Sequence, residues 1–166
     1  MNQRTIAFFS VLLAATPMQP LFALDKGDNM PDCALTPVGD TQRYNLQQFK
    51  DKVLYVDFWA SWCGPCAKSF PFLNNLDKKY QGQDLKIIGI NLDENPIDAQ
   101  DFLAKYPANF TVVADIGEQC AKTFAVKAMP SSYLVDKKGV IRHVQLGFRT
   151  DEAKALDTLL EQLLAE

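Results

Sequence analysis

The sequence predicts an α/β fold with a central mixed sheet and helices on both faces. Two runs, Val53–Trp59 and Leu85–Asn91, are rich in apolar residues, as are strands inside a sheet that is covered on both sides. Helical spacing of apolar residues follows each run, and a hairpin pattern comes late in the chain. Strands that alternate with helices in this way form a sheet between helical layers.

The chain has 166 residues, 48% hydrophobic and 22% charged, which suits one domain with its own core. We find no internal repeat and no linker that would divide it. The formal net charge of −3 argues against nucleic acid or an anionic membrane surface as the main partner.

Residues 1–23 differ from the rest. They carry one charged residue, Arg4, then an apolar run over residues 6–15, and they end at Ala23 just before the sequence becomes polar. This layout is typical of a secretory signal peptide. We therefore predict a single domain over residues 24–166 that is exported, to the periplasm or otherwise out of the cytoplasm. An uncleaved N-terminal membrane anchor is the alternative.

The elements in the first half of the domain follow from local patterns. Residues 32–35 and 42–45 predict a short hairpin around residues 37–40. After the strand Val53–Trp59, apolar residues recur at helical spacing from Pro65 to Tyr80.

Asn95-Pro96 predicts the start of the next helix, with Asn as the N-cap and Pro at the first helical position. We expect four residues on its inner face: Ile97, Phe102, Leu103 and Tyr106.

The remaining elements are shorter. The sequence predicts a strand over Phe110–Val113, a helix over residues 117–125 and a hairpin made of residues 132–135 and 140–146. The last helix begins at Thr150, and its inner stripe is leucine: Leu156, Leu159, Leu160, Leu163 and Leu164.

A pair of cysteines, Cys63 and Cys66, encloses Gly-Pro where the first long strand gives way to a helix. Such a pair serves as a structural disulfide, as half of a metal site or as a redox couple. A helix N-terminus stabilises a thiolate through its free N–H groups and its dipole. This position therefore favours a redox couple, with the first sulfur exposed and the second more shielded.

The segment "VDFWASWCGPC" resembles the active-site segment of thioredoxins, and Pro71, Met129-Pro130 and Gly147 match further positions of that superfamily. The resemblance covers roughly residues 53–164. The N-terminal hairpin and the helical insert after "GINLDE" are closer to the TlpA/ResA-like branch of exported thiol-disulfide oxidoreductases. The resemblance thus implies a thioredoxin-like fold, and an enzyme that exchanges thiols and disulfides.

The resemblance also implies roles for single residues. Cys63 matches the attacking nucleophile and Cys66 the resolving cysteine, and together they form the redox disulfide. Asp57 matches the buried carboxylate that accepts a proton. Desolvation inside an apolar strand would raise the pKa of this carboxyl group, unless the residue faces water. Lys52 or Lys86 is a candidate partner for it.

Substrate contacts follow from the same resemblance. Trp62, like Trp59, matches an aromatic residue that flanks the site, and Pro130 matches the cis-proline that faces the cysteines. Met129 would then offer its backbone to an extended substrate segment. The superfamily often has a β-branched residue at this position, so Met129 bears on fine specificity and redox tuning.

Cys33 and Cys120 lie outside this motif. An exported protein rarely keeps spare thiols, so we predict a structural disulfide between them. Two buried free cysteines, or a second redox pair, are the alternatives.

Other chemistries find little support. We predict no metal site and no cofactor, because His143 is the single histidine and a lone Cys-x-x-Cys offers too few ligands. Asp93-Glu94 is predicted to be a solvated loop, with a carboxylate that tunes the disulfide as the alternative.

The reading that remains is a periplasmic thiol-disulfide oxidoreductase that acts mainly as a reductase of protein disulfides. Gly-Pro between the cysteines is typical of reducing relatives, whereas oxidising ones often place His there. Its expected partners are disulfide-containing proteins and a membrane thiol-transfer electron donor, and cytochrome c precursors are among the candidate substrates. A disulfide-stabilised binding or scaffold module without redox turnover is the alternative.

Overall fold

A computed structural model describes residues 24–38 and 43–166. The predicted signal peptide and part of the predicted N-terminal turn lie outside these residues. Seven strands form one sheet in the order β2-β1-β5-β4-β3-β6-β7. The strands are β1 (Ala34–Pro37), β2 (Tyr44–Asn45), β3 (Val53–Trp59), β4 (Leu85–Asn91), β5 (Thr111–Ala114), β6 (Ser131–Val135) and β7 (Ile141–Leu146).

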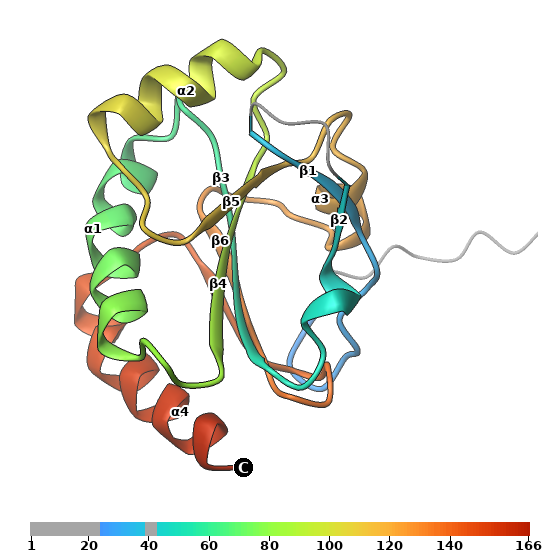
Figure 1. Cartoon of the computed structure of the whole chain (residues 1–166), viewed down its shortest axis with the longest axis vertical. Helices are drawn as coiled ribbons and strands as arrows, with labels where there is room; N and C mark the ends of the chain where they lie inside the picture. The colour runs from blue at the N-terminus through green and yellow to red at the C-terminus, as the bar shows by residue number, and fades with distance from the viewer. Residues whose placement is uncertain (1–23, 39–42) are drawn as a thin grey trace, which may run out of the picture.

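The helices lie on both sides of this sheet (Figure 1). They are α1 (Gly64–Lys79), α2 (Pro96–Lys105), α3 (Gln119–Thr123) and α4 (Ala153–Ala165), with short 3₁₀ turns at Leu46–Phe49 and Thr150–Glu152. In Figure 1, α1 and α4 cover one face of the sheet, and α3 lies on the opposite face. Strand β3 pairs in parallel with β4 and antiparallel with β6, so the sheet is mixed and the predicted fold class is confirmed.

Strand β3 lies at the centre of the core, and all seven of its residues are buried. Because side chains alternate along a strand, Tyr55 and Trp59 face α1 and α4, whereas Val56 and Phe58 face the side of α3. Each face thus has its own apolar cluster. Asp57 lies between Tyr55 and Trp59 in the alternation and therefore points to the α1 side.

The N-terminal hairpin differs in register from the prediction. Ala34 pairs with Asn45 and Leu35 with Tyr44, so the paired part of the hairpin begins two residues later than expected. Strand β1 then continues along β5, where Thr36 pairs with Ala114. The reason is that β1 must also serve as the next strand of the main sheet.

The inner face predicted for α2 is wrong at two positions. Ala99 and Phe102 are buried, whereas Ile97 is 59% exposed and Tyr106 is 40% exposed. Ile97 lies two residues before Ala99, about 200° away around the helix, so it points to solvent. Tyr106 follows the last helical residue, and its ring packs at a tilt against Phe102 with centroids 4.9 Å apart.

Within the described residues, no helix is both long enough and apolar enough to cross a membrane.

Candidate active site

Cys63 is the N-cap of α1, and its position follows from the local sequence. Pro65 lies in the first turn of the helix, where its missing N–H costs nothing. The Sγ atom of Cys63 accepts a hydrogen bond from the backbone N–H of Cys66 at 3.2 Å. The two cysteines form a disulfide with their Cα atoms 5.3 Å apart. The site therefore holds its dithiol in the oxidised form, at the positive end of the helix dipole.

The first cysteine is less exposed than its position at the helix start suggests. Cys63 is 4% exposed and Cys66 is fully buried. The reason is that both sulfurs pack into the apolar cluster between α1 and the sheet. Cys63 still lines a depression of about 410 Å³ between the start of α1 and α2. A substrate sulfur therefore has a way to approach Cys63, whereas Cys66 is shielded.

Asp57 is a buried acid with one partner. It is 1% exposed, and its Oδ1 accepts a hydrogen bond from the Ser132 hydroxyl at 2.6 Å. Its Oδ2 has no hydrogen-bond partner among the described residues. Burial raises the pKa of Asp57 from 3.8 to about 7, although the Ser132 hydrogen bond pulls the pKa down. The carboxyl group can therefore exchange a proton near neutral pH.

Neither of the two candidate partners, Lys52 and Lys86, pairs with Asp57. Lys52 forms its ion pair with Asp84 at 3.5 Å, and Nζ of Lys86 lies 5.7 Å from the ring centre of Phe49. Asp57 belongs to the middle of a central strand, where the neighbouring strands decide its partner. The register places Ser132 of β6 directly opposite, and the sequence pattern had marked Ser132 only as the start of a strand.

Trp59 is fully buried in the apolar cluster that contains both cysteines, and its indole N–H is a second buried polar group. Its ring lies against Phe70, with ring centroids 5.0 Å apart. Its Nε1 has no hydrogen-bond partner within the described part of the chain. A Cβ on Gly89 would lie 3.3 Å from this atom and 3.0 Å from the Phe110 ring, so the glycine leaves room for the indole. This part of the cluster is therefore tightly packed.

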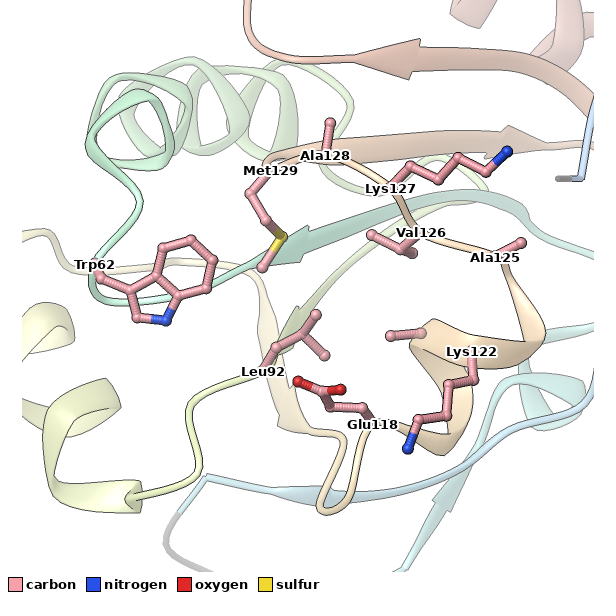
Figure 2. A pocket seen from close by; sticks show the side chains of 10 residues that line it. Trp62, Leu92, Glu118, Lys122, Ala125, Val126, Lys127, Ala128 and Met129 are labelled. Atoms are coloured by element: carbon pink, nitrogen blue, oxygen red, sulfur yellow. The ribbon is translucent and has the colours of Figure 1, made fainter.

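The loop before β6 brings the second half of the chain to the cysteines. The Met129–Pro130 peptide bond is cis, and the carbonyl of Pro130 accepts a hydrogen bond from Gly147 at 2.7 Å. Beside this loop lies a groove of about 750 Å³ (Figure 2). Trp62, which is 70% exposed, and Met129 lie toward one end of the groove, and Lys122 lies toward the other. Trp62 lines both this groove and the depression at Cys63, so an extended peptide in the groove can reach Cys63 past Trp62.

Asp93 belongs to the loop that the sequence predicts to be solvated, yet its carboxylate has three hydrogen-bond donors. Its carboxylate accepts hydrogen bonds from the backbone N–H of Ser61 at 2.9 Å, from the Ser61 hydroxyl at 2.9 Å and from Nδ2 of Asn91 at 2.7 Å. Glu94 is exposed as predicted for a solvated loop, but Asp93 is partly buried and the prediction missed its hydrogen bonds. One signal was present in the sequence, because parallel strands end at the same edge of a sheet. Asp93 follows β4 as Ser61 follows β3.

Cys33 and Cys120 form a second disulfide in the structure, with Cα atoms 5.3 Å apart. Both are buried, at 4% and 2% exposure. The bond joins the residue before β1 to α3, the short helix that precedes the cis-proline loop. Asp115 holds the same helix, because its two carboxylate oxygens accept hydrogen bonds from Cys120 and Ala121 at 3.0 and 2.7 Å.

Metal ligands do not gather in the described residues, which contain no group of three His, Cys, Asp or Glu side chains arranged to hold an ion. His143 lies on β7, paired with Leu134 of β6 and only partly buried.

A cysteine pair at a helix start, beside a cis-proline and a groove open to a peptide, can pass two electrons to another sulfur pair through a mixed disulfide. This places the protein in the class of thiol-disulfide oxidoreductases with a thioredoxin-like fold. The chain belongs to the Redoxin family, whose model matches residues 25–160. The resemblance inferred from the sequence is thus confirmed.

Individual relatives agree with this assignment. Thiol-disulfide oxidoreductase ResA from Bacillus thuringiensis subsp. konkukian is 33% identical over 129 residues, which cover 78% of this chain and 74% of the relative. ResA from Bacillus subtilis is 30% identical, with 78% and 72% covered. Among solved structures, a candidate thiol:disulfide interchange protein DsbE from Chlorobium tepidum is 42% identical with a TM-score of 0.80, and 86% of this chain and 99% of that chain are covered.

Proposed function

We propose that the protein acts mainly as a reductase of protein disulfides, with Cys63 as the nucleophile and Cys66 as the resolving cysteine. The charges around Cys63 support electron transfer from this dithiol to the substrate disulfide. The depression that Cys63 lines contains two carboxylates, Asp98 and Asp101, and one ammonium group, Lys105. Excess negative charge disfavours a thiolate, and a dithiol whose thiolate is poorly stabilised gives up its electrons more readily.

In the proposed reaction, the Cys63 thiolate attacks a disulfide of the substrate protein and forms a mixed disulfide. Cys66 then attacks Sγ of Cys63, which releases the second substrate sulfur and restores the Cys63–Cys66 bond. Asp57 takes the proton that Cys66 must lose. Its side chain lies on the face of the sheet that α1 covers, and burial brings its pKa to about 7.

Substrate segments dock beside the cis-proline in this proposal. The backbone of Met129 lies next to Pro130 at the end of the groove and can pair with an extended chain, as strand edges do. The exposed Trp62 covers the substrate residues next to their cysteine.

The setting of the reaction is part of the proposal. Residues 1–23 act as the signal peptide, and the domain over residues 24–166 works in the periplasm. Because that compartment oxidises thiols, the dithiol needs a membrane thiol-transfer partner as its electron donor. Cytochrome c precursors are candidate substrates, as the resemblance to the TlpA/ResA-like branch implies. The Cys33–Cys120 disulfide is structural.

Two measurements test the direction. Insulin reduction with dithiothreitol should be faster with the protein than without it, and Cys63→Ala should abolish the gain. A trace identical to buffer would favour a binding or scaffold module. Equilibration with glutathione should give a reduction potential nearer to about −270 mV, as in thioredoxin, than to about −120 mV, as in a strong disulfide donor. A value near the latter would overturn the reductase.

The substrate can be captured with Cys66→Ser, because this variant stops at the mixed disulfide. Proteins released from it by dithiothreitol and identified by mass spectrometry are the substrates. The matched control is Cys63→Ser, which should trap nothing.

A further inference from the structure

Ser132 lies beside the buried carboxyl group of Asp57 at the centre of the sheet. Its hydroxyl donates to Oδ1 of Asp57 at 2.6 Å, and Ser132 is itself only 6% exposed. The register pairs Asp57 with Ser132 on β6 and with Gly89 on β4. Because Gly89 has no side chain, Ser132 supplies the polar side chain that the two neighbouring strands present at this position.

Among the other groups around Asp57, Tyr55 is the one that also reaches Ser132. Tyr55 shares its face of β3. Burial and the charge of Asp57 raise the pKa of the Tyr55 hydroxyl, although a hydrogen bond with Ser132 pulls it down, so this hydroxyl stays neutral and does not compete with Asp57 for a proton. Lys52 is held by Asp84. The helices that cover this face contribute Cys66 from α1 and the apolar residues Leu156 and Leu160 from α4.

We propose that Ser132 is a positioning residue for thiol exchange: its hydroxyl fixes the Asp57 carboxyl group through Oδ1 and leaves Oδ2 to accept the proton of Cys66. The inference rests on the proposed function, in which Asp57 takes that proton. Oδ2 is buried and has no hydrogen-bond partner within the described residues. An unpartnered carboxylate oxygen in an apolar site gains most from a proton. Oδ1 thus keeps the carboxyl group in place through its hydrogen bond, and Oδ2 accepts the proton.

The step conserves atoms and electrons. In the mixed disulfide, Cys66 passes its proton to Oδ2 of Asp57, and its sulfur attacks Sγ of Cys63. The Cys63–Cys66 bond forms while the bond from Cys63 to the substrate sulfur breaks. The electron pair leaves with that sulfur, which takes a proton from water. The Ser132 hydroxyl donates to Oδ1 throughout and is not consumed.

The hydrogen bond also sets how much carboxylate is present. A donor to the ionised form favours that form, so the Ser132 hydroxyl keeps the pKa of Asp57 lower than burial alone would. Without the hydroxyl, the pKa rises and the carboxylate that accepts the proton becomes rarer at neutral pH.

Three variants of the full chain test this role. Ser132→Ala removes the donor, Ser132→Thr keeps a hydroxyl, and Ser131→Ala is the control. Ser131 is a fully buried serine on the same strand, but its hydroxyl donates to the carbonyl of Ala128 at 2.7 Å and not to Asp57. In the oxidised protein, the Asp57 carboxyl group is titrated by ¹³C NMR. Its midpoint should rise by about one pH unit in Ser132→Ala, return in Ser132→Thr and stay unchanged in Ser131→Ala.

Kinetics provide the second readout. The rate at which the mixed disulfide resolves in a single turnover should follow the same midpoint. A midpoint that moves from about 7 to about 8 makes the rate at pH 7 about fivefold lower in Ser132→Ala. Asp57→Asn should abolish this pH dependence, and adding Ser132→Ala to it should then have no further effect on the profile.

Equal titration midpoints in Ser132→Ala and wild-type protein would overturn the proposal, as would an equal shift in Ser131→Ala. A shifted midpoint with an unmoved rate profile also overturns it, because Asp57 then accepts no proton from Cys66. The titration needs no substrate, so it does not depend on the direction of electron flow. A disulfide-donor potential would therefore contradict the reductase and leave the role of Ser132 standing.

Discussion

Replacing Asp57 with asparagine tests whether the buried acid weakens the fold at neutral pH. Burial raises the pKa of this carboxyl group from 3.8 to about 7 in the folded protein, whereas the unfolded chain keeps the ordinary value. Between these pH values the folded form holds a proton that the unfolded form has released. The free energy of unfolding therefore falls as pH rises through this window, and the loss is complete above about pH 7.

The size of the effect follows from the same two values. One pH unit corresponds to about 1.4 kcal/mol for one proton, so a window of about three units lowers the free energy of unfolding by at most about 4 kcal/mol. Asparagine has nearly the same shape, cannot ionise, and accepts the Ser132 hydrogen bond through its amide oxygen. Asp57→Asn should match the wild type near pH 4 and exceed it in stability at pH 8.

Guanidinium denaturation of the oxidised protein, followed by tryptophan fluorescence at pH 4, 6 and 8, measures the difference. Ser131→Ala is the control, since loss of its buried hydroxyl should lower stability by the same amount at each pH. If Asp57→Asn and wild-type protein differ equally at pH 4 and pH 8, the carboxyl group is not held protonated by burial, and the reasoning fails.

Three further variants probe the frame around the site. Asp93→Ala leaves the Ser61 backbone N–H without its partner and should cost about 1–3 kcal/mol in urea denaturation, more than Ser61→Ala; equal losses would contradict this. Replacing Cys33 and Cys120 by alanine opens a loop with a sequence separation of 87 and should cost about 4–5 kcal/mol; an unchanged thermal midpoint would show that the bond is dispensable. Trp62→Ala should raise KM for insulin while the reaction of the reduced protein with a small disulfide reagent stays unchanged, and a slower small-molecule reaction would instead place Trp62 in the chemistry.

Features that depend on neighbours in the sequence were predictable. The apolar run of β3, the Asn95-Pro96 start of α2 and the cysteine pair at the start of α1 are all set by residues within a few positions of one another. The failure at Ile97 has a local cause as well. The sequence showed an apolar residue in a helix but not the direction in which the first turn faces. Ala99 faces the core, so Ile97 on the opposite side of the helix faces solvent.

Partners across the sheet were beyond reach. Ser132 is 75 residues from Asp57. Their contact depends on strand register, and a shift of one residue would turn the Ser132 side chain to the other face. The apolar pattern of β3 therefore predicted that Asp57 is buried, while its partner had to come from the structure. The contact between Asp93 and Ser61 is different, because both residues follow the ends of neighbouring parallel strands and the sequence therefore carried a signal for it.

The Asp93–Ser61 hydrogen bonds and the Cys33–Cys120 disulfide have a common effect on the groove. Asp93 holds the loop that leads into Cys63, and the Cys33–Cys120 bond holds α3, which leads into the cis-proline loop. Both sides of the groove are thus tied to the sheet independently of the bond that must break and form in each turnover. The Cys33–Cys120 bond can persist beside a dithiol active site, because a thiolate can break a disulfide only if it can reach one of the two sulfurs. Cys33 and Cys120 are buried on the α3 side of the sheet, whereas Cys63 and Cys66 belong to the α1 side, so within one molecule the sheet separates the reactive pair from this bond.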